Sequence, residues 1–497
     1  MAGFSSRIIC YKLQLQTMTY YPTIGLEIHA ELKTRTKMFC NSKNDSDETE
    51  PNVNVCPICM AHPGTLPVIN KEAVRHILRI GTAIKGTIAD FSEFDRKSYF
   101  YPDIPKGYQI SQYEHPLVTN GELLGVAITR VHLEEDTARS IHAHGKSLVD
   151  FNRAGIPLME LVTEPVLKDA ETAGRFAREL QLLLRTLSAS GANLEKGEMR
   201  IEANVSISSS KDAFGTKVEV KNINSFRSVE RAIAYEIQRQ TALIESGGKV
   251  SQETRGWDEA KQVTFHQRFK EGSADYRYFP EPDLPKLIIS EIPEFTSAAL
   301  KASLPELPWE RRARYESLGI RKEYIEALMQ DEFINAMFEG VAQHASKKDT
   351  TLIGLAANYI VSDIVGLMQD QKVEETCAYK NPKEFQKVFY KLVEMIKENK
   401  VSSRGAKDIL ALLYRSGGDP EVIAQERGLL QSHDVDFLRM SVLHVLQEQT
   451  KAVEEYQAGK EASLQYLIGM SMKKTKGAGN PAKLKELIVE ELKSKLG

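Results

Sequence analysis

The stretch Ile24-Gly-Leu-Glu-Ile-His-Ala-Glu-Leu32 alternates apolar and polar side chains along its whole length. Successive side chains of a β-strand point to opposite faces of the sheet, so this pattern predicts a strand with one buried face. Glu27, His29 and Glu31 would then share the other face. That face joins two carboxylates to an imidazole, and such a set of groups can bind a cation.

Three further segments, residues 128–135, 199–207 and 216–221, show the same alternation. A half-buried antiparallel sheet with its polar face in water explains any one of them. Four polar faces that combine carboxylate, imidazole, amide and cationic groups instead indicate a trough for phosphates and a divalent cation, with Mg²⁺ favoured over zinc by the oxygen ligands. The polar side chains are Arg130, His132 and Glu134; Arg200, Glu202, Asn204 and Ser206; and Lys217, Glu219 and Lys221.

The chain as a whole has the composition of a water-soluble globular protein. Its 497 residues are 42% hydrophobic and 27% charged, with a net charge of −3, so any contact with nucleic acid must come from local basic patches. No run of 18 apolar residues predicts a membrane span. Five unevenly spaced cysteines do not form a disulfide framework, which indicates a reducing, cytoplasmic setting.

The order of strand and helix patterns along the sequence predicts an α+β protein with several domains. Short alternating strands, turns and a few helices give way to helical patterns after the proline-rich stretch Pro280-Glu-Pro-Asp-Leu-Pro285. We predict a disordered extension at residues 1–17 and a cradle domain on a mainly antiparallel sheet at residues 18–295. A helical domain at residues 296–400 and an all-helical C-terminal tail at residues 401–497 would follow.

Cys40, Cys56 and Cys59 are candidate zinc ligands, because Cys56-Pro-Ile-Cys59 has the spacing of a zinc knuckle and Cys40 lies 16 residues before it. A structural zinc site takes four ligands. Ser42 is a poor fourth ligand, whereas His62 is a reasonable one. Bound zinc and three reduced structural cysteines both remain open.

Two other features could contact RNA. The aromatic segments 99–108 and 275–283 interleave rings with Arg or Lys, which can stack on unpaired bases or can form rigid loops packed on the core. The C-terminal residues 473–497 carry seven lysines and three glutamates, including the basic cluster Lys473, Lys474 and Lys476. This cluster would contact phosphates, or it would simply end a solvated helix.

Several known catalytic signatures are missing. His144-Gly-Lys-Ser147 ends like a phosphate-binding P-loop, but Ser140 stands where that motif needs its first glycine. The sequence has no dinucleotide-binding fingerprint, no amidase signature with a catalytic lysine and no convincing cysteine–histidine glutaminase pair. If ATP binds, it uses another geometry.

Long stretches of the chain carry a more specific signal. They are Phe94-Asp-Arg-Lys-Ser-Tyr-Phe-Tyr-Pro-Asp-Ile-Pro-Lys-Gly-Tyr-Gln-Ile-Ser-Gln112, His132-Leu-Glu-Glu-Asp136, Asp150-Phe-Asn-Arg-Ala-Gly-Ile-Pro157, Arg200-Ile-Glu-Ala-Asn-Val-Ser206, Lys217-Val-Glu-Val-Lys-Asn-Ile-Asn-Ser-Phe226, Gln252-Glu-Thr-Arg255, Asp275-Tyr-Arg-Tyr-Phe-Pro-Glu-Pro-Asp283 and Met472-Lys-Lys-Thr-Lys-Gly-Ala-Gly-Asn-Pro481. Together with residues 24–33, and in the same order, these stretches resemble the motifs of the B subunit of the aspartyl/glutamyl-tRNA amidotransferases.

The resemblance implies a reaction and its partners. ATP would activate the side-chain carboxylate of glutamate mischarged on tRNA-Gln, or of aspartate on tRNA-Asn. Ammonia released from glutamine by the A subunit, an amidase, would then give the amide, while a small C subunit braces the assembly. The missing amidase signature agrees with a nucleophile on that amidase partner. Phosphoryl transfer depends mainly on positioning and charge neutralisation rather than on a protein nucleophile.

The same resemblance suggests roles for the polar strand faces. Mg²⁺ would be held by Glu27, His29 and Glu135, with help from Glu134. Phosphate would be faced by Lys97, Arg200 and Lys217, and the pocket would be lined by Glu202, Asn204 and Glu219. The tail lysines Lys473, Lys474 and Lys476 would contact tRNA.

One departure and two alternatives accompany this interpretation. Family members with a zinc knuckle have Cys-x-Cys before the Cys-x-x-Cys, whereas the second position here is Ser42. This departure puts zinc in doubt without touching the activity. The alternatives are a non-catalytic tRNA-binding protein on the same scaffold and a free-standing ATP-dependent carboxylate ligase for a small molecule.

Overall fold

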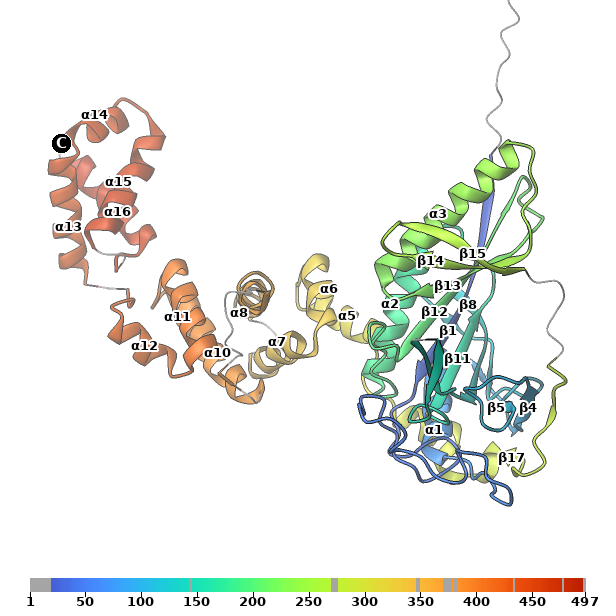
Figure 1. Cartoon of the computed structure of the whole chain (residues 1–497). Helices are drawn as coiled ribbons and strands as arrows, with labels where there is room; N and C mark the ends of the chain where they lie inside the picture. Colours follow the sequence, from blue (N-terminus) through green and yellow to red (C-terminus); the bar gives the residue numbers. More distant parts are fainter. Residues whose placement is uncertain are drawn as a thin grey trace, which may run out of the picture. The chain divides into compact units, whose positions relative to one another are not determined.

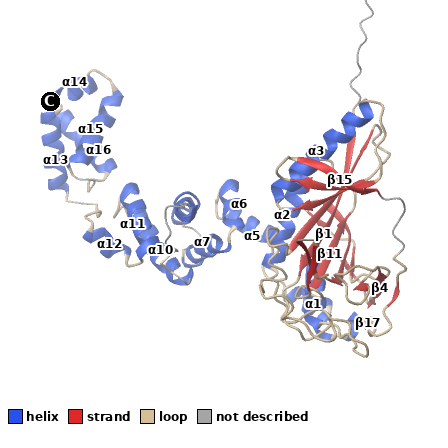
Figure 2. Ribbon diagram, viewed as in Figure 1, coloured by secondary structure: helices blue, strands red, loops and turns tan. Residues whose placement is uncertain are grey.

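The structure is a computed structural model that describes residues 19–143, 145–269, 276–345, 349–369, 378–379, 382–431, 434–475 and 478–494. It divides into two compact units, Met1–Leu307 and Pro308–Gly497. All named strands lie in the first unit, and the second unit is helical (Figure 1 and Figure 2). The predicted α+β class with a helical C-terminal part is confirmed. The predicted extension at residues 1–17 lies outside the described residues.

A ten-stranded sheet forms the body of the first unit, in the order β15-β14-β13-β12-β1-β11-β8-β6-β2 with β7 paired to β8. All pairs between adjacent strands are antiparallel except β13 with β14. The mainly antiparallel sheet is therefore confirmed. The strand bounds are β1 Tyr21–Glu31, β2 Thr87–Ile88, β6 Val118–Thr119, β7 Glu122–Leu123, β8 Val126–Glu135, β11 Pro157–Thr163, β12 Met199–Ser208, β13 Val218–Ile223, β14 Glu253–Asp258 and β15 Val263–Phe269.

The apolar face of the sheet is buried as the alternation predicts. Ile24, Leu26, Ile28 and Ala30 of the central strand β1 are at most 1% exposed. Two long helices, α2 (Ala170–Thr186) and α3 (Phe226–Glu245), lie along the sheet in Figure 1, and their own apolar sides are buried. Asp169 and Ser225 cap the N-termini of these helices by accepting backbone N–H bonds.

Smaller elements surround the other end of the sheet. Strand β4 (Asp95–Ser98) lies between β5 (Tyr108–Ser111) and β16 (Phe279–Pro280), so segments far apart in sequence meet. Two further pairs join β3 (Phe91–Ser92) to β17 (Leu287–Ile288), and β9 (Arg139–Ala143) to β10 (Lys146–Asp150). Helix α1 (Lys71–Ala83) begins at the N-cap Asn70.

The first unit ends at Leu307, beyond the predicted boundary at residue 295. Two short 3₁₀ turns, Ile289–Glu291 and Pro293–Phe295, lead into helix α4 (Ser297–Ala302), which packs against α1. The Arg79 guanidinium on α1 donates to the Ser303 carbonyl at 3.1 Å. These contacts hold α4 with the sheet unit.

The second unit is a succession of helices. Its last four build a core of their own, with Leu438, Leu467, Leu484 and Ile488 among the buried residues. The predicted boundary at residue 400 stays a prediction. The helices are α5 Pro308–Ser317, α6 Lys322–Gln330, α7 Glu332–His344, α8 Thr350–Tyr359, α9 Val365–Gln369, α10 Pro382–Lys397, α11 Ser403–Ser416, α12 Pro420–Glu426, α13 Val435–Glu448, α14 Thr450–Gln457, α15 Glu461–Lys474 and α16 Pro481–Ser494, with a π-helical turn at Ile360–Ile364.

The continuous helical stretch Thr350–Gln369 is long and apolar enough to cross a membrane by length and composition alone. A buried helix of a helical bundle passes the same test, and 39% of this window is buried inside the second unit. Its π-helical turn contains Asp363, whose carboxylate forms an ion pair with Lys407 at 2.7 Å. A carboxylate paired with a lysine of another helix, α11, and a buried apolar side are typical of a helix packed in a bundle.

Truncating the core of β1 should destabilise the first unit. Replacing Ile28 by Ala removes a side chain that is 0% exposed, and such changes cost about 2–5 kcal/mol because a cavity remains. The matched control is Val68→Ala, since Val68 is 70% exposed. Urea unfolding followed by Trp257 fluorescence in a Trp309→Phe background reports this unit. Equal midpoints for the two variants would contradict the packing.

Candidate functional site

The register of the central strands brings the predicted polar residues onto one face of the sheet. Across β1 and β12, His29 pairs with Arg200 and Glu27 with Glu202. On the other side of β1, His29 pairs with Glu160 of β11, which in turn lies opposite His132 of β8. Side chains in directly opposed positions lie on the same face. The polar faces predicted for separate strands therefore form one continuous surface.

The first group on this face surrounds His29. Its Nε2 lies 3.3 Å from Glu160 Oε2, 3.7 Å from Glu134 Oε1 and 3.9 Å from Glu27 Oε1. Burial disfavours the imidazolium, but these carboxylates outweigh it and raise the pKa of His29 to about 9. His132 Nε2 lies 3.5 Å from the same Glu160. The group therefore concentrates negative charge where a cation is stabilised.

The pKa values of the carboxylates in this group are shifted in opposite directions. Burial would raise the pKa of Glu160, but the two histidines lower it strongly. Glu134 shows the same balance, since its hydrogen bond with His132 and the charge of His29 lower its pKa against burial. Burial and the neighbouring Glu160 instead raise the pKa of Glu27. Glu27 is thus the carboxylate that gains most from an added cation.

A second acidic group shares Glu27 with the first. Carboxylate oxygens of Glu27, Glu202 and Glu219 all lie within 4.8 Å of one another. The Lys221 ammonium sits among them, 2.6 Å from Glu202 and 3.8 Å from Glu219. The Thr254 hydroxyl donates to Glu219 at 2.7 Å from β14. This group already holds one positive charge.

Two cationic side chains border the acidic groups. The Arg200 guanidinium binds the buried Asp136 carboxylate, and its Nε has no hydrogen-bond partner among the described residues. Burial opposes the charge of Lys97, but Glu134, Tyr278 and Glu160 raise its pKa. Both cations are fixed near the carboxylates and keep capacity to bind an anion.

Two predicted residues lie elsewhere. Glu135 points away from its neighbour Glu134, since its carboxylate binds the Lys106 ammonium at 2.7 Å and the Ile110 N–H at 2.9 Å. Lys217 is exposed and precedes β13, whereas Lys221 lies on the polar face. Adjacent strand residues face opposite sides, so Glu134 and Glu135 cannot both join the group around His29.

The remaining predicted residues are placed as follows. Asn204 lies opposite Gly25 and Glu219, and its Oδ1 is buried without a hydrogen-bond partner among the described residues. Lys473 and Lys474 are exposed at the end of α15, and Lys474 lies 3.3 Å from Glu448. Lys476 lies outside the described residues.

Sequence reasoning missed Glu160. It occupies the middle of β11, whose other residues make an almost continuous apolar run with the periodicity of a fully buried strand. A single carboxylate within an apolar run is the feature of the sequence that could have indicated Glu160 as a site residue. His132 and Lys221 were placed on polar faces without a role, because pairing between strands is not visible in the pattern of one strand.

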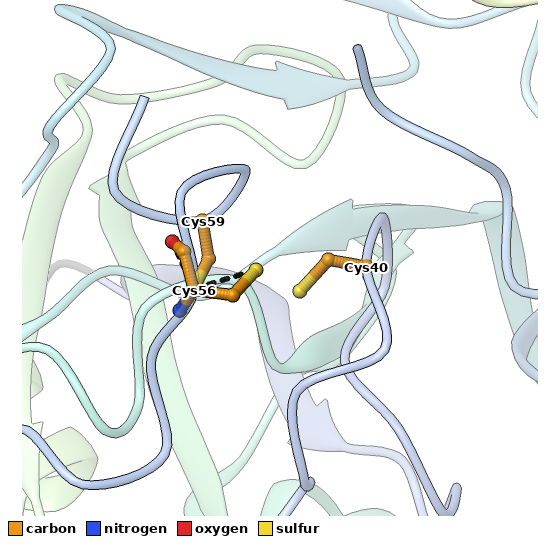
Figure 3. Close-up of side chains that lie close together, drawn as sticks. All are labelled: Cys40, Cys56 and Cys59. Carbon is orange, nitrogen blue, oxygen red and sulfur yellow. Dashed lines mark hydrogen bonds between the residues drawn. The ribbon is translucent and has the colours of Figure 1, made fainter. Parts of the chain in front are cut away.

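The three cysteines meet in a separate cluster (Figure 3). Cys56 Sγ and Cys59 Sγ are 3.8 Å apart, and the Sγ atoms of Cys40, Cys56 and Cys59 all lie within 4.8 Å of one another. The hydrogen bond with Cys40 lowers the pKa of the Cys59 thiol to about 4, with burial opposing and the Lys37 ammonium assisting. The Ser42 hydroxyl lies 3.7 Å from Cys59 Sγ.

This cluster does not complete a structural zinc site. Such sites take four nitrogen or sulfur ligands, and only these three thiols group together among the described residues. A fully buried cation, Lys37, already stands 3.8 Å from Cys59 Sγ and donates to the Phe151 carbonyl at 3.1 Å. His62 lines the same cavity as Cys40 and Cys59 but is not part of the close group.

A mainly antiparallel sheet with an acidic polar face, followed by a helical unit, describes the class of protein, and comparison with known families identifies it. The family described as GatB/GatE catalytic domain matches residues 22–293, and the GatB domain matches residues 336–492. The chain belongs to the GatB family, as the sequence motifs predict.

Three curated relatives illustrate the similarity. The chain is 42% identical to the B subunit of the aspartyl/glutamyl-tRNA(Asn/Gln) amidotransferase of Thermus thermophilus, over 95% of this chain and 99% of that protein. The protein of the same name from Gloeothece citriformis is 40% identical over 96% and 98%. The B subunit of the chloroplastic/mitochondrial glutamyl-tRNA(Gln) amidotransferase of Physcomitrium patens is 40% identical over 95% and 85%.

Removing Glu160 should lower the pKa of His29. Glu160→Gln deletes the carboxylate that hydrogen-bonds the imidazolium, so we expect the pKa to fall from about 9 by roughly one unit or more. Glu27→Gln should cause a smaller fall, because its charge contributes less. A ¹⁵N-histidine NMR titration of the metal-free chain measures both, with the signal assigned through His29→Gln. An unchanged midpoint in Glu160→Gln would contradict the described contacts.

Proposed function

We propose that this chain is the B subunit of a tRNA-dependent amidotransferase, a ligase that forms a carbon–nitrogen bond with glutamine as the amido donor. Its substrates would be glutamate on tRNA-Gln, aspartate on tRNA-Asn, or both. The near full-length similarity to subunits of that name supports the assignment. The observation that carries the chemistry is the polar sheet face, where Glu27, His29 and Glu160 meet and cations stand beside them.

The reaction needs phosphoryl transfer followed by acyl substitution. A side-chain carboxylate oxygen attacks the γ-phosphorus of ATP, the bond to ADP breaks, and an acyl phosphate forms. Ammonia then attacks the acyl carbon, the carbon–oxygen bond to phosphate breaks, and a proton is lost from nitrogen. Neither step needs a protein nucleophile, so the chain must supply positioning and charge.

The cations on the polar face fit the phosphate part of this reaction. Lys97 and Lys221 remain charged because nearby carboxylates raise the pKa of each against burial. Arg200 has a buried Nε without a partner among the described residues. Such groups stabilise charge that develops on transferring phosphate oxygens. In this assignment Lys221 takes the role that the sequence suggested for Lys217.

The acidic groups fit a Mg²⁺ ion. Glu27, Glu134 and Glu160 offer oxygens of the kind that Mg²⁺ prefers, and His29 would have to lose its proton to serve as a ligand. A bound Mg²⁺ would neutralise phosphate charge. Glu160 therefore replaces Glu135 in the proposed ligand set, because Glu135 is engaged by Lys106.

The proposed partners supply functions, such as ammonia release, for which this chain carries no signature. Ammonia would come from a partner with amidase activity, the A subunit, and a small C subunit would complete a cytoplasmic assembly. Lys473 and Lys474 would contact the tRNA backbone from the last unit. A free-standing small-molecule ligase would not need the helical unit, yet the relatives match across it.

Lys221→Met should abolish most of the amidation. We expect a loss of about 10²-fold or more, because the cation that pairs with Glu202 on the proposed phosphate-binding face is removed. Lys217→Met should stay within about threefold of wild type, because Lys217 is exposed and its charge is solvated. The measurement is amide formation on mischarged tRNA by the assembled complex with ATP. Glutaminase activity, assayed in parallel, should be retained in both; full amidation by Lys221→Met would refute the assignment.

Replacing Lys473 and Lys474 together by alanine should weaken tRNA binding. Loss of two phosphate contacts lowers the slope of log affinity against log salt by about 1–2. Filter binding of tRNA to the complex at several salt concentrations measures this slope. The double arginine variant keeps the charge and should bind as wild type does. An unchanged slope in the alanine variant would place the tRNA contact elsewhere.

A further inference from the structure

A dithiol lies in the loop between β1 and α1. Cys56 and Cys59 have the Cys-x-x-Cys spacing, their Sγ atoms are 3.8 Å apart, and the Cys56 N–H donates to Cys59 Sγ at 3.1 Å (Figure 3). Both side chains therefore point to a common spot. A disulfide needs an S–S distance of about 2.05 Å, so the two sulfurs would have to approach each other by side-chain rotation.

The surroundings favour two sulfurs without a metal. The donor set stops at three thiols among the described residues, and Ser42 occupies the neighbouring position. Lys37 Nζ lies 3.8 Å from Cys59 Sγ; burial lowers the pKa of Lys37, and the neighbouring cysteines partly oppose this effect. This side chain is 0% exposed and is also held by the Phe151 carbonyl. The cluster thus keeps cysteine chemistry available that a complete zinc site would block.

The sulfurs differ in how a small reagent can reach them. Cys56 is half-buried, whereas Cys59 is 6% and Cys40 8% exposed. Cys40 and Cys59 also line a cavity of about 270 Å³, whereas Cys56 does not. A reagent that arrives from the solvent outside this cavity would meet the half-buried Cys56 first, with Cys59 Sγ 3.8 Å from Cys56 Sγ.

We propose that Cys56 and Cys59 form a reversible disulfide by exchange with a low-molecular-weight disulfide of the glutathione type. The Cys56 thiolate attacks one sulfur of the reagent, whose S–S bond breaks and releases one thiol. The Cys59 thiolate then attacks Cys56 Sγ in the mixed disulfide and releases the second thiol. The protein is oxidised by two electrons, the reagent is reduced to two thiols, and the two cysteine protons end on these thiols. This modification site does not depend on the proposed activity.

Thiol counting in the intact complex tests the proposal. Cys10 and Cys377, outside the described residues, are first replaced by serine so that only the cluster is counted. The complex is equilibrated with oxidised and reduced glutathione at increasing disulfide-to-thiol ratios, quenched in acid, denatured and alkylated. We expect the alkylated thiols of the chain to fall from three to one. A peptide map without reductant should then link Cys56 to Cys59, and dithiothreitol should reverse the change.

Matched variants and a metal assay make the outcome decisive. Cys40→Ser should still form the link, whereas Cys56→Ser and Cys59→Ser should not. If all three thiols stay free at the highest glutathione disulfide ratio, or if the link joins Cys40 instead, the proposal fails. It also fails if the complex purified without chelator carries one zinc per chain and its thiols react only after the zinc is removed.

Discussion

The register between β1 and its neighbours β11 and β12 sets which side chains meet on the polar face. His29 lies opposite Glu160 on one side and Arg200 on the other, while Ile28 points into the core. A shift by one residue would bury the polar side chains and expose the apolar ones. The packing of the apolar face under α2 and α3 therefore fixes the chemistry of the opposite face.

Charge balance is the second constraint on this surface. Several carboxylates gather there, and isolated buried carboxylates are costly unless cations or hydrogen bonds compensate them. Lys221, Arg200 and protonated His29 provide that compensation within the described chain. Glu27, which belongs to both acidic groups, is incompletely compensated, since burial and Glu160 raise its pKa. In the proposed function, a bound Mg²⁺ would supply the positive charge that Glu27 lacks in the described chain.

The cysteine cluster is built from thiols rather than carboxylates. Buried Lys37 lies beside its sulfurs, and only three thiols group together among the described residues. With Ser42 in place of a fourth cysteine, the three sulfurs lie close together but cannot supply four ligands to a metal ion. Two of these sulfurs, Cys56 Sγ and Cys59 Sγ, lie 3.8 Å apart and are the pair that would form the proposed disulfide.

Alternation along single strands was enough to predict the buried and polar faces of β1 and β12, and the long motifs were enough to predict the family. The α+β class followed from the change of periodicity after the first unit. The partners of β1 across the sheet could not be predicted, because its register with β11 and β12 depends on contacts between segments more than one hundred residues apart. Only the tertiary structure therefore placed Glu160 beside His29, whereas alternation alone already put Glu135 on the face opposite Glu134 and Lys221 on the face of Glu219.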